Sequence, residues 1–273
     1  MRLGWRLGPT PGCLDTDLLR RYADATRDPS PRARTGEAVP TSALVTLIWD
    51  AQNEARRQLV DQSLFKGATG VVHGEHQIVL HRAVEPDEPL QIWAEGHGAR
   101  TAGRNALVTL RYSALDPSGA VVADQWWTTV LVGVSCAPVG ESPPDHAFPD
   151  LARRHPLGAY AVAVDEEMAH RYAAVTGDWS AHHFDGEAAR RSGFDRPFLH
   201  GLCTMALCGQ AITEIVASGD PTRVRRLAVR FAAPTYLGER LEVNLYDAGG
   251  LGVAFEAHAG TVAVITHGRA ELW

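Results

Sequence analysis

Cysteine is scarce in this sequence, with four residues in a chain of 273. One pair stands five positions apart within an apolar run and the other two are isolated; the four are Cys13, Cys136, Cys203 and Cys208. Thiols this few and scattered exclude a disulfide scaffold and a structural zinc site made of closely spaced cysteines. The pair in the apolar run is expected to be buried as small hydrophobic side chains.

Excess positive charge and long apolar runs are also missing. The 26 lysine and arginine residues are outnumbered by 32 aspartate and glutamate residues, which gives a formal charge of −6. Phosphate-binding surfaces need clustered basic residues, so neither nucleic acid nor an anionic membrane is expected as a partner. The segment 1–12 has no apolar core of a signal peptide, and no uninterrupted apolar run is long enough to span a bilayer. We therefore expect a soluble, cytoplasmic protein.

What the sequence does contain is an internal repeat. Hydrophobic residues make up 45% of the chain and charged residues 21%, which is typical of globular proteins, and the length suits one large or two average domains. When residues 15–38 are set over residues 165–188, ten of 24 positions are identical. The identical pairs are Asp15/Asp165, Arg21/Arg171, Tyr22/Tyr172, Ala23/Ala173, Thr26/Thr176, Asp28/Asp178, Ser30/Ser180 and the Gly-Glu-Ala runs 36–38 and 186–188.

Each copy of the repeat begins with the pattern of a short helix and continues into alternating strands. Apolar residues alternate with polar ones over 105–114 in the first half and over 241–246 in the second. Five prolines fall within 137–158, a composition typical of a linker. We therefore predict two tandem α+β units: residues 1–136, a linker at 137–158, and residues 159–273.

The second unit contains a strongly apolar helix. The segment Gly201 to Gly219 carries one charged residue, Glu214, and its large apolar residues recur at helical spacing. A helix of this kind must be covered on most sides, as if a sheet were wrapped around it. Its first N–H groups have no partner within the helix, so the N–H of Gly201 is predicted to be free. An ordinary buried core helix is the alternative, and the corresponding segment 44–59 of the first unit is more polar.

The loop before this helix holds a candidate acid–base pair. Asp178 and His183 lie five residues apart, close enough to converge on one water molecule if the chain turns between them. The alternative is a turn-capping aspartate beside a solvated histidine. The repeat helps to decide, because Asp28 matches Asp178 whereas Ala33 replaces His183. The sequence therefore predicts one such site per chain, in the second unit.

This stretch resembles the signature of the MaoC-like, (R)-specific enoyl-CoA hydratases, the hydratase 2 family. The matching residues are Gly177, Asp178, His183, Asp185, Gly193 to Asp195, Pro197 and His200 to Leu202. Weaker likeness extends over nearly the whole chain, including the run from Val72 to His76. The resemblance implies a double hot-dog fold, in which an antiparallel sheet wraps one central helix in each of two tandem units.

The same resemblance implies roles for individual residues. Asp178 and His183 would hold and activate water, and the backbone N–H of Gly201 would bind the thioester oxygen as negative charge develops there. Ser180 and His200 would border the substrate. Ser180 stands where the family has asparagine, and Ala181 where it has proline. No metal or other cofactor is implied, because the CoA or carrier-protein phosphopantetheine arm is part of the substrate.

Three arginines beside this loop could hold phosphate groups of the substrate. Arg190, Arg191 and Arg196 lie between the loop and the helix that follows it. A solvated, purely structural rim is an equally supported interpretation.

Three functional hypotheses follow. The first is reversible hydration of trans-2-enoyl thioesters to (3R)-3-hydroxyacyl thioesters. The second is dehydration of an unusual acyl chain in specialised biosynthesis, and the third is a non-catalytic hot-dog subunit that binds acyl thioesters. The paired Asp178 and His183 favour catalysis, since a binding module would have no need to retain both. Assembly as a homodimer is left open.

Overall fold

The protein is described here by a computed structural model of residues 4–61 and 65–273, so the first three residues of the segment inspected for a signal peptide lie outside the described residues. Within this part of the chain, 11 strands form one antiparallel sheet in the order β1-β3-β4-β5-β2-β8-β11-β10-β9-β7, with β6 beside β3. The strands are β1 (Arg6–Gly12), β2 (Gly70–Leu80), β3 (Leu90–Ala102), β4 (Asn105–Leu115), β5 (Val121–Val132), β6 (Val139–Gly140), β7 (Pro156–Ala163), β8 (Val224–Phe231), β9 (Arg240–Asp247), β10 (Gly252–Ala259) and β11 (Val262–Leu272).

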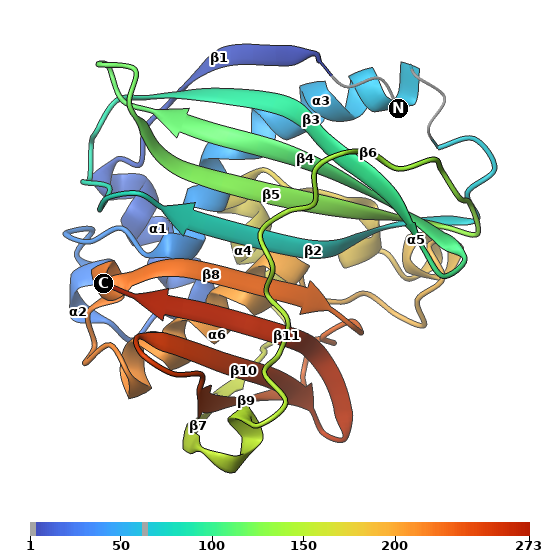
Figure 1. Cartoon of the computed structure of the whole chain (residues 1–273). Coiled ribbons are helices and arrows are strands. Elements are labelled where there is room, and N and C mark those ends of the chain that lie inside the picture. Colours follow the sequence, from blue (N-terminus) through green and yellow to red (C-terminus); the bar gives the residue numbers. More distant parts are fainter. Residues whose placement is uncertain (1–3, 62–64) are drawn as a thin grey trace.

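The longer helices lie together behind this sheet, as Figure 1 shows. No helix in the described ranges is long and apolar enough to cross a membrane. The helices are α1 (Thr16–Thr26), α2 (Pro31–Arg34), η1 (Thr41–Ile48), α3 (Trp49–Asp61), η2 (Ala152–Arg154), α4 (Met168–Thr176), η3 (Ala181–His183), α5 (Gly186–Arg191), α6 (Gly201–Ile215) and η4 (Pro221–Arg223), where η marks a 3₁₀ helix.

The two halves of the chain meet where β2 pairs with β8. This antiparallel junction runs from Glu75 opposite Arg230 to Val79 opposite Arg226, and it makes one continuous sheet of two half-sheets. The first half-sheet curves around α3 and the second around α6, whose side chains are mostly buried. Cys203 and Cys208 are fully buried in α6, as their apolar surroundings predict. The predicted double hot-dog architecture is confirmed.

The repeated segments form equivalent helices that pack against each other. α1 and α4 are in contact, and the rings of Tyr22 and Tyr172 lie 6.0 Å apart between them. An ion pair of 3.1 Å joins Arg27, at the end of α1, to Asp165, just before α4. The tyrosines that the two copies share therefore meet at the contact between the halves, whereas the ion pair uses Arg27, which the second copy lacks.

Several predicted boundaries shift in the structure. The apolar helix predicted to extend to Gly219 ends at Ile215, because Val216 leaves helical geometry at φ −121°, and Ser218 and Gly219 follow with positive φ angles. The first-unit segment 44–59, which corresponds to the apolar helix, is divided between η1 and α3. The predicted linker contains β6 and η2, and its last residues open β7, an edge strand whose first position accepts proline.

Asp28, the first-half counterpart of Asp178, is a buried carboxyl group. Its side chain is 7% exposed and its Oδ1 accepts a hydrogen bond of 2.9 Å from the Ser30 N–H. Burial raises the pKa of Asp28 to about 6, with a smaller contribution from Glu214. The pKa of Asp28 in the folded protein is therefore above that of an aspartate in an unfolded chain.

Replacing Asp28 should change how stability depends on pH. Because the folded pKa is raised, the unfolded state loses this proton first, so stability falls as pH rises from about 4 to above 6. We expect Asp28→Asn, which keeps the acceptor for Ser30, to remove this loss and to be more stable than the parent near neutral pH, by about 3 kcal/mol at most. Urea unfolding of both proteins across this range measures the difference. A variant that loses stability as steeply as the parent would contradict the assignment.

Candidate active site

A cavity of about 460 Å³ lies between the two halves of the chain. The second half contributes Asp178, Ser180, His183, His200 and Gly201 to its wall, all singled out from the sequence. The first half contributes residues of α3, β2, β4 and β5 that sequence reasoning did not single out as site residues: Trp49, Gln52, Asn53, Arg56, Val71, Val72, His73, Leu110, Trp127 and Thr129. The candidate site is therefore built by both repeats.

The turn after α4 directs Asp178 into this cavity. Gly177 ends α4 in the left-handed region at φ 81°, where glycine is favoured. The Oδ1 atom of Asp178 accepts hydrogen bonds from the Ser180 N–H at 3.1 Å and from the Ser180 hydroxyl at 2.6 Å. The hydroxyl at position 180 thus fixes the orientation of the carboxylate, although the side chain is shorter than the asparagine implied by the resemblance.

His183 is held with one ring nitrogen bonded and the other directed toward Asp178. Its Nδ1 lies 2.8 Å from the carbonyl oxygen of Phe198, so Nδ1–H donates there and Nε2 keeps its lone pair. The side chain is 5% exposed, and burial, helped by the nearby rings of His200 and His182, lowers the pKa of His183 to about 2. The imidazole is neutral and acts as a hydrogen-bond acceptor at Nε2.

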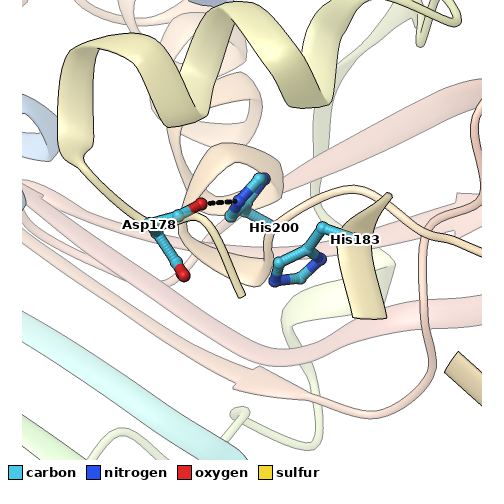
Figure 2. Close-up of side chains that lie close together, drawn as sticks. All are labelled: Asp178, His183 and His200. Carbon is cyan, nitrogen blue, oxygen red and sulfur yellow. Dashed lines mark hydrogen bonds between the residues drawn. The ribbon is translucent and has the colours of Figure 1, made fainter. Parts of the chain in front are cut away.

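His200 connects the loop after α4, which holds Asp178, to the start of α6. Its Nε2–H donates to the backbone oxygen of Asp178 at 2.8 Å, the dashed contact in Figure 2. Its ring stacks on that of His183 with centroids 3.8 Å apart. Burial lowers the pKa of His200, so this ring is also neutral. The contact keeps Asp178 beside the helix terminus, which makes His200 a positioning residue.

Gly201 places a free N–H at the edge of the same cavity. It is the first residue of α6, and its N–H donates to no residue within the described ranges. A side chain here would be crowded, because a Cβ atom would lie 3.1 to 3.3 Å from the ring of Phe231. The helix N-terminus carries partial positive charge, so this N–H suits an oxygen atom that gains negative charge.

The same three side chains include potential metal ligands. One ligand atom each from Asp178, His183 and His200 lies within 4.8 Å of the others. Metal binding by two imidazoles requires the ion to lie in the plane of both rings. The two rings here are stacked and inclined by only 29°, so their lone pairs run side by side rather than converge. The arrangement suits a water molecule better than a metal ion.

The arginines proposed to hold phosphate groups do not line the cavity. Arg190 is exposed and pairs with Glu187 at 3.2 Å, and Arg191 is exposed as well. Arg196 pairs with Glu239 at 3.1 Å and lies over the ring of Tyr236. Arg56 does line the cavity. In the sequence, the one feature that pointed to Arg56 was its place in segment 44–59 of the first half, which is more polar than the apolar helix of the second half.

These features define a double hot-dog protein with one candidate site at the terminus of its second central helix. Residues 148–268 match the family described as MaoC like domain, and the chain therefore carries a MaoC-like domain. The resemblance noted in the sequence is thereby confirmed.

Two curated relatives are similar over much of this chain. 3-Hydroxyacyl-thioester dehydratase Y of Mycobacterium tuberculosis is 32% identical over 182 residues, which are 64% of this chain and 61% of that protein. Enoyl-CoA hydratase 2, peroxisomal, of Arabidopsis thaliana is 27% identical over 188 residues, 66% of this chain and 60% of that protein. The chain thus spans about three-fifths of the length of these relatives.

Solved structures show the same fold over nearly the whole chain. A MaoC-like dehydratase from Phytophthora capsici superposes with a TM-score of 0.83 at 19% identity, covering 98% of this chain and 95% of that one. A Mycobacterium tuberculosis protein described as having a double hotdog fold superposes with a TM-score of 0.62 at 17% identity, covering 99% and 96%.

Proposed function

We propose that this protein catalyses the reversible hydration of trans-2-enoyl thioesters to (3R)-3-hydroxyacyl thioesters, as a hydro-lyase. The observation that carries the proposal is that Asp178, His183 and Gly201 line one cavity, to which they offer a carboxylate, an imidazole nitrogen and a free N–H. The names of the curated relatives support the same reaction class. The thioester's CoA or carrier-protein arm belongs to the substrate, and no other cofactor is proposed.

The residues that line the cavity can serve two steps of hydration: the attack of water on the acyl chain and the build-up of negative charge on the thioester oxygen. A water molecule between Asp178 and His183 would donate to both, which leaves its oxygen lone pair free to attack C3 of the enoyl group. As the O–C3 bond forms, the electrons of the double bond move to the thioester oxygen, where the Gly201 N–H and the start of α6 stabilise the negative charge.

The proton balance assigns different tasks to the two side chains. An imidazole with a pKa of about 2 is a weak base, so His183 orients the water and Asp178 accepts its proton. That proton is then delivered to C2 as the enolate collapses, so the net change is addition of H and OH. Dehydration runs through the same steps in reverse.

The non-catalytic hypothesis fits the site less well than either form of the hydro-lyase hypothesis. A non-catalytic acyl-binding subunit has no use for a carboxylate held by Ser180 beside a neutral imidazole. Dehydration of an unusual acyl chain uses the same groups and differs only in the substrate. A cytoplasmic location and a homodimer remain proposals, and a relative of similar sequence is named as peroxisomal.

A hydration assay tests the proposal directly. The purified chain is mixed with trans-2-enoyl-CoA esters from crotonyl upward, the loss of the conjugated enoyl absorbance is followed, and the product is resolved on a chiral column. We expect hydration to the (3R)-hydroxyacyl product. Failure to hydrate any chain length would refute the proposed reaction, and a mainly (3S) product would refute the proposed mechanism.

A further inference from the structure

His73 is a polar residue in the cavity wall that the first half of the chain supplies. Its ring lies flat on that of Trp127, with centroids 3.7 Å apart and planes inclined by 2°. The ring of Phe231 is 4.9 Å away on another side. Apolar residues, among them Leu110 of β4 and Val72 beside His73 on β2, line the same cavity. An imidazole is an unusual neighbour for a plain alkyl chain.

A β-bulge turns His73 toward the cavity. In the pairing of β2 with β5, His73 lies opposite Thr129 and Glu75 lies opposite Thr128, so Gly74 is an extra residue. Residues three apart on a regular strand point to opposite faces, but this insertion places His73 on the same face as His76. Glycine suits the bulge, because a Cβ at position 74 would overlap a methyl group of Val130 unless that side chain moved.

The ring nitrogen Nε2 of His73 has no hydrogen-bond partner among the described residues, and it is shielded from bulk solvent. Burial, reinforced by His76, holds the pKa of His73 well below its ordinary value, so the ring is neutral. A neutral imidazole has one donor and one acceptor nitrogen, and an unpaired buried nitrogen is destabilising. His76 differs, because its Nε2 is 3.1 Å from Gln125 Oε1.

Phe231 gives the position of His73 relative to the reacting atoms. One side of the Phe231 ring is against Gly201, the proposed partner of the thioester oxygen, and His73 is a further ring contact away. Gly201 and His73 thus both border the Phe231 ring, which places His73 further along the cavity wall from the proposed thioester site.

We propose that His73 binds a polar substituent, a hydroxyl or an oxo group, on the distal part of the acyl chain. The substrates are then functionalised acyl thioesters in preference to plain alkyl ones, and His73 is the residue that determines this specificity. The inference rests on the proposed hydratase function and deepens it, since it names the substrate class of the same site.

The experiment compares matched pairs of substrates. Trans-2-enoyl-CoA esters of six to ten carbons are prepared with and without a terminal hydroxyl group, and kcat/KM is measured for both members of each pair. The unmodified protein should prefer the hydroxylated member by about ten-fold or more at the chain length that reaches His73, the effect of one buried hydrogen bond. His73→Phe keeps an aromatic ring against Trp127 but removes both nitrogens, so it should abolish or reverse the preference.

Crotonyl-CoA is the internal control in the unmodified protein, because it carries no distal substituent and reports whether the chain hydrates enoyl thioesters at all. If crotonyl-CoA is hydrated but the unmodified protein turns over both members of every pair equally, the inference is overturned and the proposed function stands. If no enoyl thioester is hydrated, the proposed function itself fails. Should His73→Phe not fold, the paired comparison in the unmodified protein still decides between these results.

Discussion

Asp178→Asn and His183→Ala are each expected to lower kcat for enoyl-CoA hydration by at least ~100-fold. Asparagine at position 178 can still accept the hydrogen bonds from Ser180, but it cannot take a proton from water. Alanine at position 183 removes the Nε2 acceptor that orients the water. Steady-state rates with crotonyl-CoA give the losses, and thermal unfolding shows whether each variant retains its fold.

The internal repeat provides a matched control for this experiment. Asp28→Asn makes the same chemical change at the equivalent position of the first half, where Ala33 replaces the histidine. Asp28 does not line the cavity, so its replacement should leave turnover close to that of the parent. Equal losses for Asp28→Asn and Asp178→Asn would show that the protein does not use a single site in its second half.

Gly201→Pro should lower kcat by about 10² to 10³-fold relative to Gly201→Ala, because only proline lacks the N–H that is proposed to bind the thioester oxygen. Proline is well accepted as the first residue of a helix. The preceding residue, His200, already has the extended ψ angle of 133° that a following proline requires. The comparison therefore removes one donor with little change in the backbone.

Alanine is the appropriate reference because both replacements bring a Cβ atom against the ring of Phe231. Any rate lost through that contact is common to the two variants. The ratio of their kcat values isolates the N–H group, whereas their KM values report on substrate binding. Similar kcat values for the two variants would mean that the oxygen is stabilised elsewhere.

The sequence was most informative where function depends on residues close together in the chain. Gly177, Asp178 and His183 fall within one short loop, and the apolar helix after it could be recognised from its composition. The duplication was visible because ten of 24 aligned positions are identical, among them the two tyrosines that meet between α1 and α4. The double hot-dog fold followed from these features together with the family resemblance.

Contacts between distant parts of the chain could not be predicted in this way. The first-half wall of the cavity depends on α3, β2 and β5 meeting the loop of the second half, and no local pattern records that meeting. The bulge at Gly74 reverses the face of His73, which strict alternation along the strand would assign wrongly. Arg196 is engaged by Glu239, a partner 43 residues away along the chain.

Because β2 and β8 belong to one chain, the assembly of the cavity at their junction does not depend on protein concentration. A pseudo-twofold interface of this kind, between two separate hot-dog subunits, would obey mass action and dissociate on dilution. Here the chain itself links the two sides, so the wall built by the first repeat accompanies the loop of the second at any protein concentration. Covalent linkage also releases the halves from the requirement to be identical. The first repeat has Ala33 where the second has His183 and supplies one wall of the cavity, whereas the second supplies the proposed reacting groups.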